Sequence, residues 1–198
     1  MTLTTSAGVL SVQRLFSKYF VSSTISYEEI PDFIKPAIDF DIAEFSDPII
    51  LPLLSTDSLQ FIPDGQQYLR SEKIMRIANY ESANKFLNVC VNSSEGSFRN
   101  CSICSKCMRT INVLESLDLL EQFENIFDYD LYRRKRFGYM AKLRIDYNKS
   151  PFAKDNVNVA RANRKYVPSR LLSLIFLSPK ILINVLRALL RFALGKQY

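Results

Sequence analysis

A chain of 198 residues is long enough for one domain and an appendage, and 47% hydrophobic content with five glycines indicates a globular, helix-rich protein. The chain has no histidine, which excludes Cys/His and Ser/His catalytic pairs and the commonest general base. Residues 1–130 hold 10 Lys and Arg against 18 Asp and Glu, whereas residues 131–198 hold 16 against 2, so the two parts face different surroundings.

Residues 1–128 predict a partial α/β domain. Apolar spacing predicts, in chain order, a helix over 6–18, strands over 19–27 and 59–63, a helix over 71–80, a strand over 86–91 and a helix over 105–117. Ser6 and Ser105 are expected to cap the first and last of these helices. Five prolines make the rest of residues 28–69 irregular, and Asp64-Gly65 is a turn signal.

Residues 129–198 predict a basic, helical C-terminal extension. Its expected helices cover residues 130–147, a short stretch within 148–167, then 169–177 and 179–194. In the last of these, the cations fall in one narrow wedge of an otherwise apolar helix. A helix of that length spans roughly 22 Å, less than the roughly 30 Å of a bilayer core. It is therefore expected to pack on a partner or another copy of the chain, or to lie on an anionic membrane surface.

All four cysteines of the chain lie in one stretch, Cys90, Cys101, Cys104 and Cys107. The CxxCxxC spacing brings thiolates onto one ion, and the distant fourth cysteine completes a tetrahedron, which predicts a closed, structural zinc site. The alternatives are an iron–sulfur cluster, unligated thiols and a secreted disulfide framework. No apolar run follows a charged N-terminus, so we expect no signal peptide and a cytoplasmic protein.

Two stretches resemble a known family: residues 51–77 (LPLLSTDSLQFIPDGQQYLRSEKIMRI) and residues 90–117 (CVNSSEGSFRNCSICSKCMRTINVLESL). They are similar to the C-terminal half of proteins related to 7-cyano-7-deazaguanine synthase, in the ATP-pyrophosphatase (adenine nucleotide α-hydrolase-like) superfamily. The resemblance covers residues 15 to 125, and the cysteine pattern is its most specific part. It implies an incomplete three-layer, nucleotide-α-hydrolase-like sandwich in which a strand-end cysteine and the CxxCxxC triplet hold a structural zinc.

The resemblance also implies an ATP-dependent activity that this chain lacks alone. In the superfamily a Ser-Gly-Gly-x-Asp-Ser loop cradles the ATP pyrophosphate, and no such loop occurs in the sequence. We therefore expect the back half of a longer or split protein, which binds ATP only when another chain supplies the N-terminal half. Weak candidates for substrate contact are Ser55, Thr56, Asp57 and Arg70, although turn formation and helix capping explain them equally well.

Two functions of different classes follow. The first is the zinc-stabilised C-terminal portion of an ATP-pyrophosphatase-like protein, inactive by itself. The second is a non-catalytic zinc module whose tail, residues 179–194, contacts a membrane surface or a protein. The basic run Arg133–Arg136 has neighbouring tyrosines but no recognised nucleic-acid motif, so a solvated helix face is expected there and no nucleic-acid partner.

Overall fold

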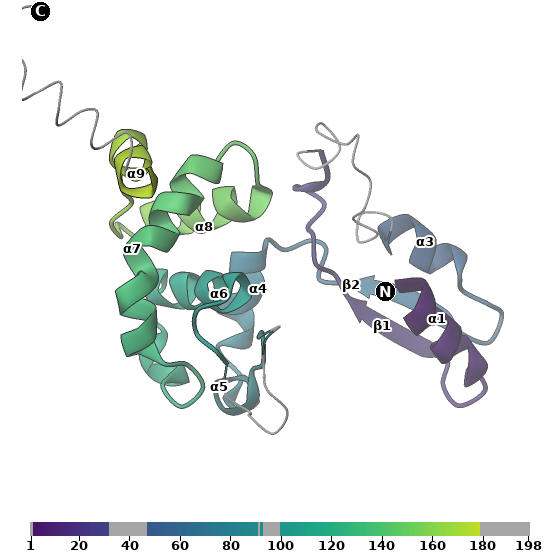
Figure 1. Cartoon of the computed structure of the whole chain (residues 1–198). Coiled ribbons are helices and arrows are strands. Elements are labelled where there is room, and N and C mark those ends of the chain that lie inside the picture. Colours follow the sequence, from purple (N-terminus) through teal and green to yellow (C-terminus); the bar gives the residue numbers. More distant parts are fainter. Residues whose placement is uncertain (1, 32–46, 91, 93–99, 179–198) are drawn as a thin grey trace, which may run out of the picture. The chain divides into compact units, whose positions relative to one another are not determined.

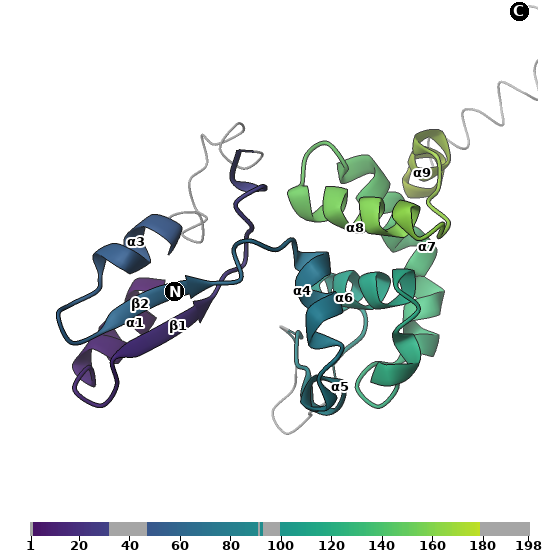
Figure 2. The same ribbon diagram turned by 180° about the vertical axis from the view of Figure 1, so that it is seen from behind.

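A computed structural model describes residues 2–31, 47–90, 92 and 100–178 of the chain. The fold is mixed α/β and mostly helical, with one small parallel sheet among these residues. Packing divides the chain into two compact units, residues 1–73 and 74–198. Figures 1 and 2 show the two units from opposite sides.

The first unit is built on two parallel strands, β1 (Lys18–Ser22) and β2 (Gln60–Asp64), paired from Lys18 with Gln60 to Ser22 with Asp64. Helices α1 (Thr2–Ser11) and α3 (Asp47–Leu53) accompany them. Leu51 of α3 and Leu59 and Phe61 of the β2 segment are buried together, and α1 contributes partly buried side chains. The small core therefore joins both helices to the sheet.

Two predictions for this unit need correction. The first helix covers residues 2–11 rather than 6–18, and Ser6 lies inside it, buried, instead of capping it. It ends at Ser11, whose hydroxyl donates to the carbonyl of Gly8 at 2.7 Å and so competes with the helical backbone. Residues 47–53, expected to be irregular, form α3. Pro48 is compatible with the first turn of a helix, and Pro52 falls one residue before its end.

The second unit is a helical bundle around α6 (Ser105–Ser116), whose Ile111, Val113 and Leu114 are completely buried. The chain reaches α6 through α4 (Arg70–Ile77) and α5 (Glu81–Phe86). After it come a 3₁₀ turn (Leu120–Phe123), α7 (Tyr129–Asp146), α8 (Pro151–Ala162) and α9 (Arg170–Leu177). The helices predicted at 105–117, 130–147 and 169–177 are thereby confirmed to within one or two residues.

Polar contacts tie α7 and α8 to α6. The buried Asn112 amide donates to Asn156 of α8 at 3.1 Å. Glu115 pairs with Arg136 of α7 at 2.7 Å and accepts from the Tyr132 hydroxyl at 2.8 Å. Both helices were assigned to the C-terminal extension from sequence, and they pack directly on α6. The boundary after residue 128 stays a prediction.

The last described helix, α9, packs on α7. Phe176 meets Phe137 edge-on at 4.8 Å between ring centroids, and Ser173 is fully buried. The amphipathic helix predicted over 179–194 lies outside the described residues. Over the part of the chain that is described, no helix combines the length and apolar character that a membrane span requires.

Candidate metal centre

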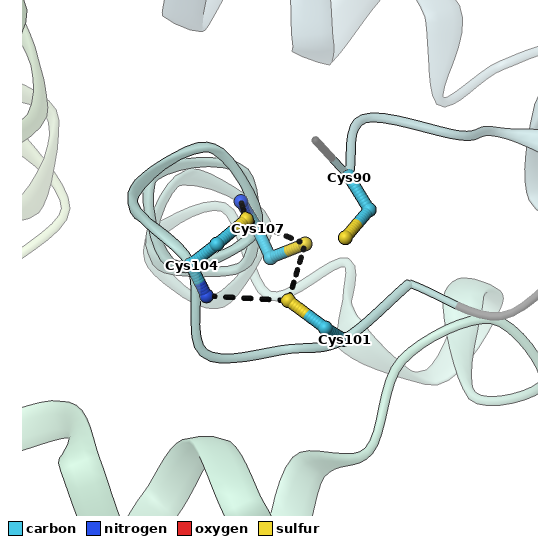
Figure 3. Close-up of side chains that lie close together, drawn as sticks. All are labelled: Cys90, Cys101, Cys104 and Cys107. Carbon is cyan, nitrogen blue, oxygen red and sulfur yellow. Dashed lines mark hydrogen bonds between the residues drawn. The ribbon is translucent and has the colours of Figure 1, made fainter. Parts of the chain in front are cut away.

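The four cysteines come together at the amino end of α6. Cys90 follows α5, Cys101 lies in the loop before α6, Cys104 directly precedes the helix, and Cys107 lies in its first turn. Their Sγ atoms all lie within 4.8 Å of one another. Figure 3 shows the four side chains converging, with Cys90 approaching from a separate segment of chain. The structure therefore confirms that the predicted ligand set is one cluster able to bind a metal ion.

The sulfur separations fit a shared ion and not disulfides. Cys107 Sγ lies 3.4 Å from Cys104 Sγ and 3.8 Å from Cys101 Sγ. Bonds of about 2.3 Å to a tetrahedral zinc place two sulfurs about 3.8 Å apart. A disulfide requires about 2.05 Å. All four cysteines are free thiols, so the spacing matches a four-sulfur coordination sphere.

Backbone N–H groups at the start of α6 orient the sulfurs of Cys101 and Cys104. The Cys104 N–H donates to Cys101 Sγ at 3.4 Å, and the Cys107 N–H donates to Cys104 Sγ at 3.5 Å. The second bond makes Cys104 the N-cap of α6, a role predicted for Ser105. A capping side chain must accept from the first turn, and the thiol at position 104 does so. One residue thus both starts the helix and offers a ligand atom.

Ser102 shapes the turn between the first two cysteines of the triplet. Its φ of +61° lies in the left-handed region, and the residue is fully buried. Its hydroxyl donates to the Asn100 carbonyl at 3.3 Å and accepts from the Asp128 N–H at 2.8 Å. These bonds offset the cost of the unusual backbone conformation, and they attach the metal loop to the start of α7.

Asn100, which the sequence analysis did not single out, connects both halves of the cluster. Its side-chain oxygen accepts from the N–H groups of Val89 and Cys90, at 2.8 and 3.1 Å. Its amide nitrogen donates to the carbonyls of Leu87 and Ile126, at 2.9 and 3.3 Å. The strand predicted over 86–91 is wrong for the described residues 86–90, because α5 extends to Phe86 and the N–H groups of Val89 and Cys90 bond to the Asn100 side chain instead of a partner strand. Residue 91 lies outside the described residues. The only sequence signal for this role was its position directly before Cys101.

The surroundings shift the pKa values of Cys90, Cys101 and Cys107 in different directions. Burial raises the pKa of Cys107 far above its usual value, and the neighbouring Cys104 adds to the effect. Burial also raises the pKa of Cys101. At Cys90 burial acts in the same direction, but hydrogen bonds from the N–H groups of Cys101 and Asn92 outweigh it and lower the pKa. A metal must therefore displace protons to bind here, as it does at other thiolate sites.

Cysteine catalysis finds no support in the surroundings of the cluster. The chain has no histidine to serve as a base. Arg109, which is two residues from Cys107, lies over the ring of Phe152 with its guanidinium carbon 4.2 Å from the centroid. A closed set of four sulfurs leaves no open coordination position for a substrate. The arrangement suits a structural role.

The weak substrate candidates are not brought together. Ser55, Thr56 and Asp57 precede the amino end of β2, whereas Arg70 follows its carboxyl end. The Ser55 hydroxyl accepts from the Phe61 N–H at 3.0 Å, and Thr56 accepts from the Leu59 N–H at 3.1 Å. These bonds shape the turn into the strand. A role for the four residues in substrate contact stays a prediction.

No protein-family model matches the chain, and searches of the curated proteins and of the solved structures find no match. The geometry therefore carries the functional conclusion, which is a four-cysteine site able to hold a structural metal ion.

Proposed function

We propose that Cys90, Cys101, Cys104 and Cys107 bind one structural Zn²⁺ and that this ion holds the second unit together. The observation that carries the proposal is the convergence of four thiol sulfurs within 4.8 Å. Sulfur ligands suit zinc and iron–sulfur clusters, and one tetrahedral set fits a single zinc ion. The ion would fasten the segment after α5 to the start of α6, in addition to the hydrogen bonds of Asn100 and the packing of Leu87 and Val89 on the core. Such a site contributes folding free energy directly.

Elemental analysis of the purified full chain tests this proposal. One equivalent of zinc per chain, no visible absorbance from iron and sulfide, and loss of the zinc in Cys104→Ser are expected. A matched control is Ser105→Ala, which alters the next residue of α6 without removing a sulfur. A chain that is fully folded without any bound metal would contradict the proposal, and stoichiometric iron and sulfide would replace zinc with a cluster.

We further propose that the chain is the C-terminal portion of an ATP-pyrophosphatase-like protein related to 7-cyano-7-deazaguanine synthase. Support comes from the similarity of residues 51–77 and 90–117. A pair of parallel strands with a helix in their connection is also compatible with part of a larger three-layer sandwich. In this proposal another polypeptide or a preceding segment supplies the Ser-Gly-Gly-x-Asp-Ser loop. ATP would bind only to the complete assembly.

Reading the coding DNA tests the relationship. A Ser-Gly-Gly-x-Asp-Ser sequence upstream in the same frame, or in a neighbouring gene, is expected. Co-expression of that segment with the chain should then yield a complex that releases pyrophosphate from ATP. Absence of such a sequence from both places would leave only the non-catalytic zinc module.

A second candidate function is contact of the C-terminal region with an anionic membrane surface. The observation that favours it is α9, where Leu171 is 68% exposed and Leu174, Phe176 and Leu177 are 39–53% exposed. Residues 131–198 hold only two acidic residues among 16 basic ones, so exposed apolar side chains occur in a cationic region. That combination suits the interface of an anionic bilayer.

Sedimentation with vesicles tests membrane contact. The full chain is expected to sediment with phosphatidylserine-containing vesicles and much less with neutral phosphatidylcholine vesicles. Leu171→Ser and the double variant Arg187→Glu/Arg191→Glu should each weaken the interaction, whereas Ser11→Ala in the first unit should not. Equal sedimentation of all variants would rule this function out.

A further inference from the structure

Two arginines meet at one tyrosine ring where α7 packs against α8. Arg144 lies in the last turn of α7, Tyr147 directly follows that helix, and Arg161 lies in the last turn of α8. The guanidinium carbon of Arg144 is 5.7 Å from the centroid of the Tyr147 ring, and that of Arg161 is 5.4 Å from the same centroid. One ring therefore holds two cations from different helices at one place.

A hydrogen bond fixes the ring and brings a third donor to it. The Tyr147 hydroxyl donates to Asn158 Oδ1 at 2.9 Å. Asn158 and Arg161 are three residues apart on α8, so they share one face of that helix. Because the tyrosine binds the oxygen of the amide, the Asn158 nitrogen keeps its two N–H groups for other partners. Two guanidinium groups and one amide NH₂ are thus gathered around Tyr147.

The two cations have no counter-ion in the described part of the chain. There, neither Arg144 nor Arg161 forms an ion pair or a side-chain hydrogen bond. Within residues 131–178, 12 Lys and Arg stand against two carboxylates. Arg161 and Asn158 are exposed and Arg144 is half-buried, so an anion from solvent can reach all three. The cluster offers positive charge and N–H donors that the described residues leave unused.

We propose that Arg144, Asn158 and Arg161 bind the phosphate group of a small phosphomonoester, with Tyr147 positioning the two guanidinium groups. The guanidinium fork matches the oxygens of a phosphate, and such charge-assisted hydrogen bonds are stronger than neutral ones. A phosphomonoester carries a charge of about −1.5 to −2 at pH 7, which two arginines neutralise. None of the four residues belongs to the metal centre or to α9, so the site is independent of the functions proposed for them.

Titration calorimetry of the full chain at pH 7.5 and constant ionic strength tests the site with glycerol 3-phosphate. Dimethyl phosphate is the matched control, because it is a phosphate with a single charge. Glycerol 3-phosphate is expected to bind at one site per chain and at least ten-fold more tightly than dimethyl phosphate. Its affinity should fall several-fold at pH 5, since the phosphate regains a proton at about pH 6 while arginine stays charged. No binding at millimolar concentration, or equal binding of the two phosphates, overturns the proposal.

Variants locate the binding. Arg161→Gln and Asn158→Asp are each expected to weaken glycerol 3-phosphate binding at least ten-fold. Asn158→Asp keeps the oxygen that accepts from Tyr147 and places a negative charge where a donor stood. Arg134→Gln removes the same charge as Arg161→Gln from an exposed position elsewhere on α7 and should leave binding unchanged. Equal weakening by Arg134→Gln would show general attraction to a basic helix, and it overturns the site.

Substitution of Tyr147 tests its positioning role. Tyr147→Leu retains both arginines and should still weaken binding at least ten-fold, because the guanidinium groups lose the ring that they share. Tyr147→Phe keeps the ring and should restore most of the binding. Unchanged binding in Tyr147→Leu overturns the role of the tyrosine. If Tyr147→Leu does not fold, Arg144→Gln decides by the same ten-fold criterion.

Discussion

The Asn100 side chain accepts a hydrogen bond from the Cys90 N–H at 3.1 Å and thereby fixes the one candidate ligand that lies outside the CxxCxxC triplet. Its amide also bonds to the backbone on either side of the cluster, at Leu87 and Ile126. Asn100 is 4% exposed, so water cannot replace these bonds. The position of Cys90 is consequently set before a metal binds.

Replacing Asn100 should damage both folding and metal affinity. In Asn100→Asp the donating nitrogen becomes an oxygen that faces the carbonyls of Leu87 and Ile126. Loss of two bonds at a buried site costs about 2–4 kcal/mol of unfolding free energy. Guanidinium denaturation of the zinc-loaded chain measures the stability, and competition with a chelator measures the affinity. Asn158→Asp is the control, because its exposed oxygen still accepts from the Tyr147 hydroxyl.

Equal stability and zinc affinity of Asn100→Asp and the unaltered chain would show that the triplet alone positions the metal.

Cysteine substitutions should separate packing from ligation. Cys107 is completely buried in the core around α6, whereas Cys90 is only partly covered. In the metal-free protein Cys107→Ser is expected to lose about 1–2 kcal/mol, because a buried hydroxyl replaces a thiol with no assured partner. Cys90→Ser should change the metal-free stability by less than about 0.5 kcal/mol. Both variants should lose the zinc, which denaturation with and without metal measures.

If metal-free Cys90→Ser loses more stability than metal-free Cys107→Ser, the packing contribution lies at Cys90. That result would contradict the buried position of Cys107.

The cysteine cluster could be predicted from sequence because spacing alone restricts where the sulfurs can lie. The long helices around it were predictable for a similar reason, since their apolar spacing matches a buried face. The prediction of a strand over 86–91 was wrong because alternating apolar and polar residues indicate only that a segment is half-buried. The alternation does not show which group accepts from the backbone N–H groups, and at Val89 that group is the Asn100 side chain. Likewise, sequence could not show that a buried side-chain oxygen of Glu29 and of Gln66 has no hydrogen-bond partner among the described residues, because that property depends on how two loops meet.

Metal affinity should fall steeply with decreasing pH. Burial raises the pKa of both Cys101 and Cys107, so at least these two thiols carry protons in the metal-free chain near neutrality. Zinc binding then releases at least two protons, and the binding constant should drop at least about 100-fold for each unit of pH between 8 and 6. Chelator competition at several pH values, with the chelator's own protonation corrected, measures the slope. A slope of one proton or less would contradict the protonation assigned to these thiols.

Alkaline pH should destabilise the protein through Tyr132. Burial raises the pKa of its hydroxyl above the usual 10.0, and the Glu115 carboxylate that accepts its proton adds to the shift. Above pH 10 the unfolded chain loses this proton and the folded chain keeps it, so the stability contribution is complete below pH 10 and declines as pH rises. The decline approaches about 1.4 kcal/mol per pH unit. Tyr132→Phe should remove this contribution to the slope and should lower the unfolding free energy at neutral pH by about 1–3 kcal/mol. The control Tyr166→Phe, at an exposed tyrosine, should keep the slope of the unaltered chain. Guanidinium denaturation between pH 9 and 11 measures the slopes, and equal slopes for Tyr132→Phe and the unaltered chain would contradict the assignment.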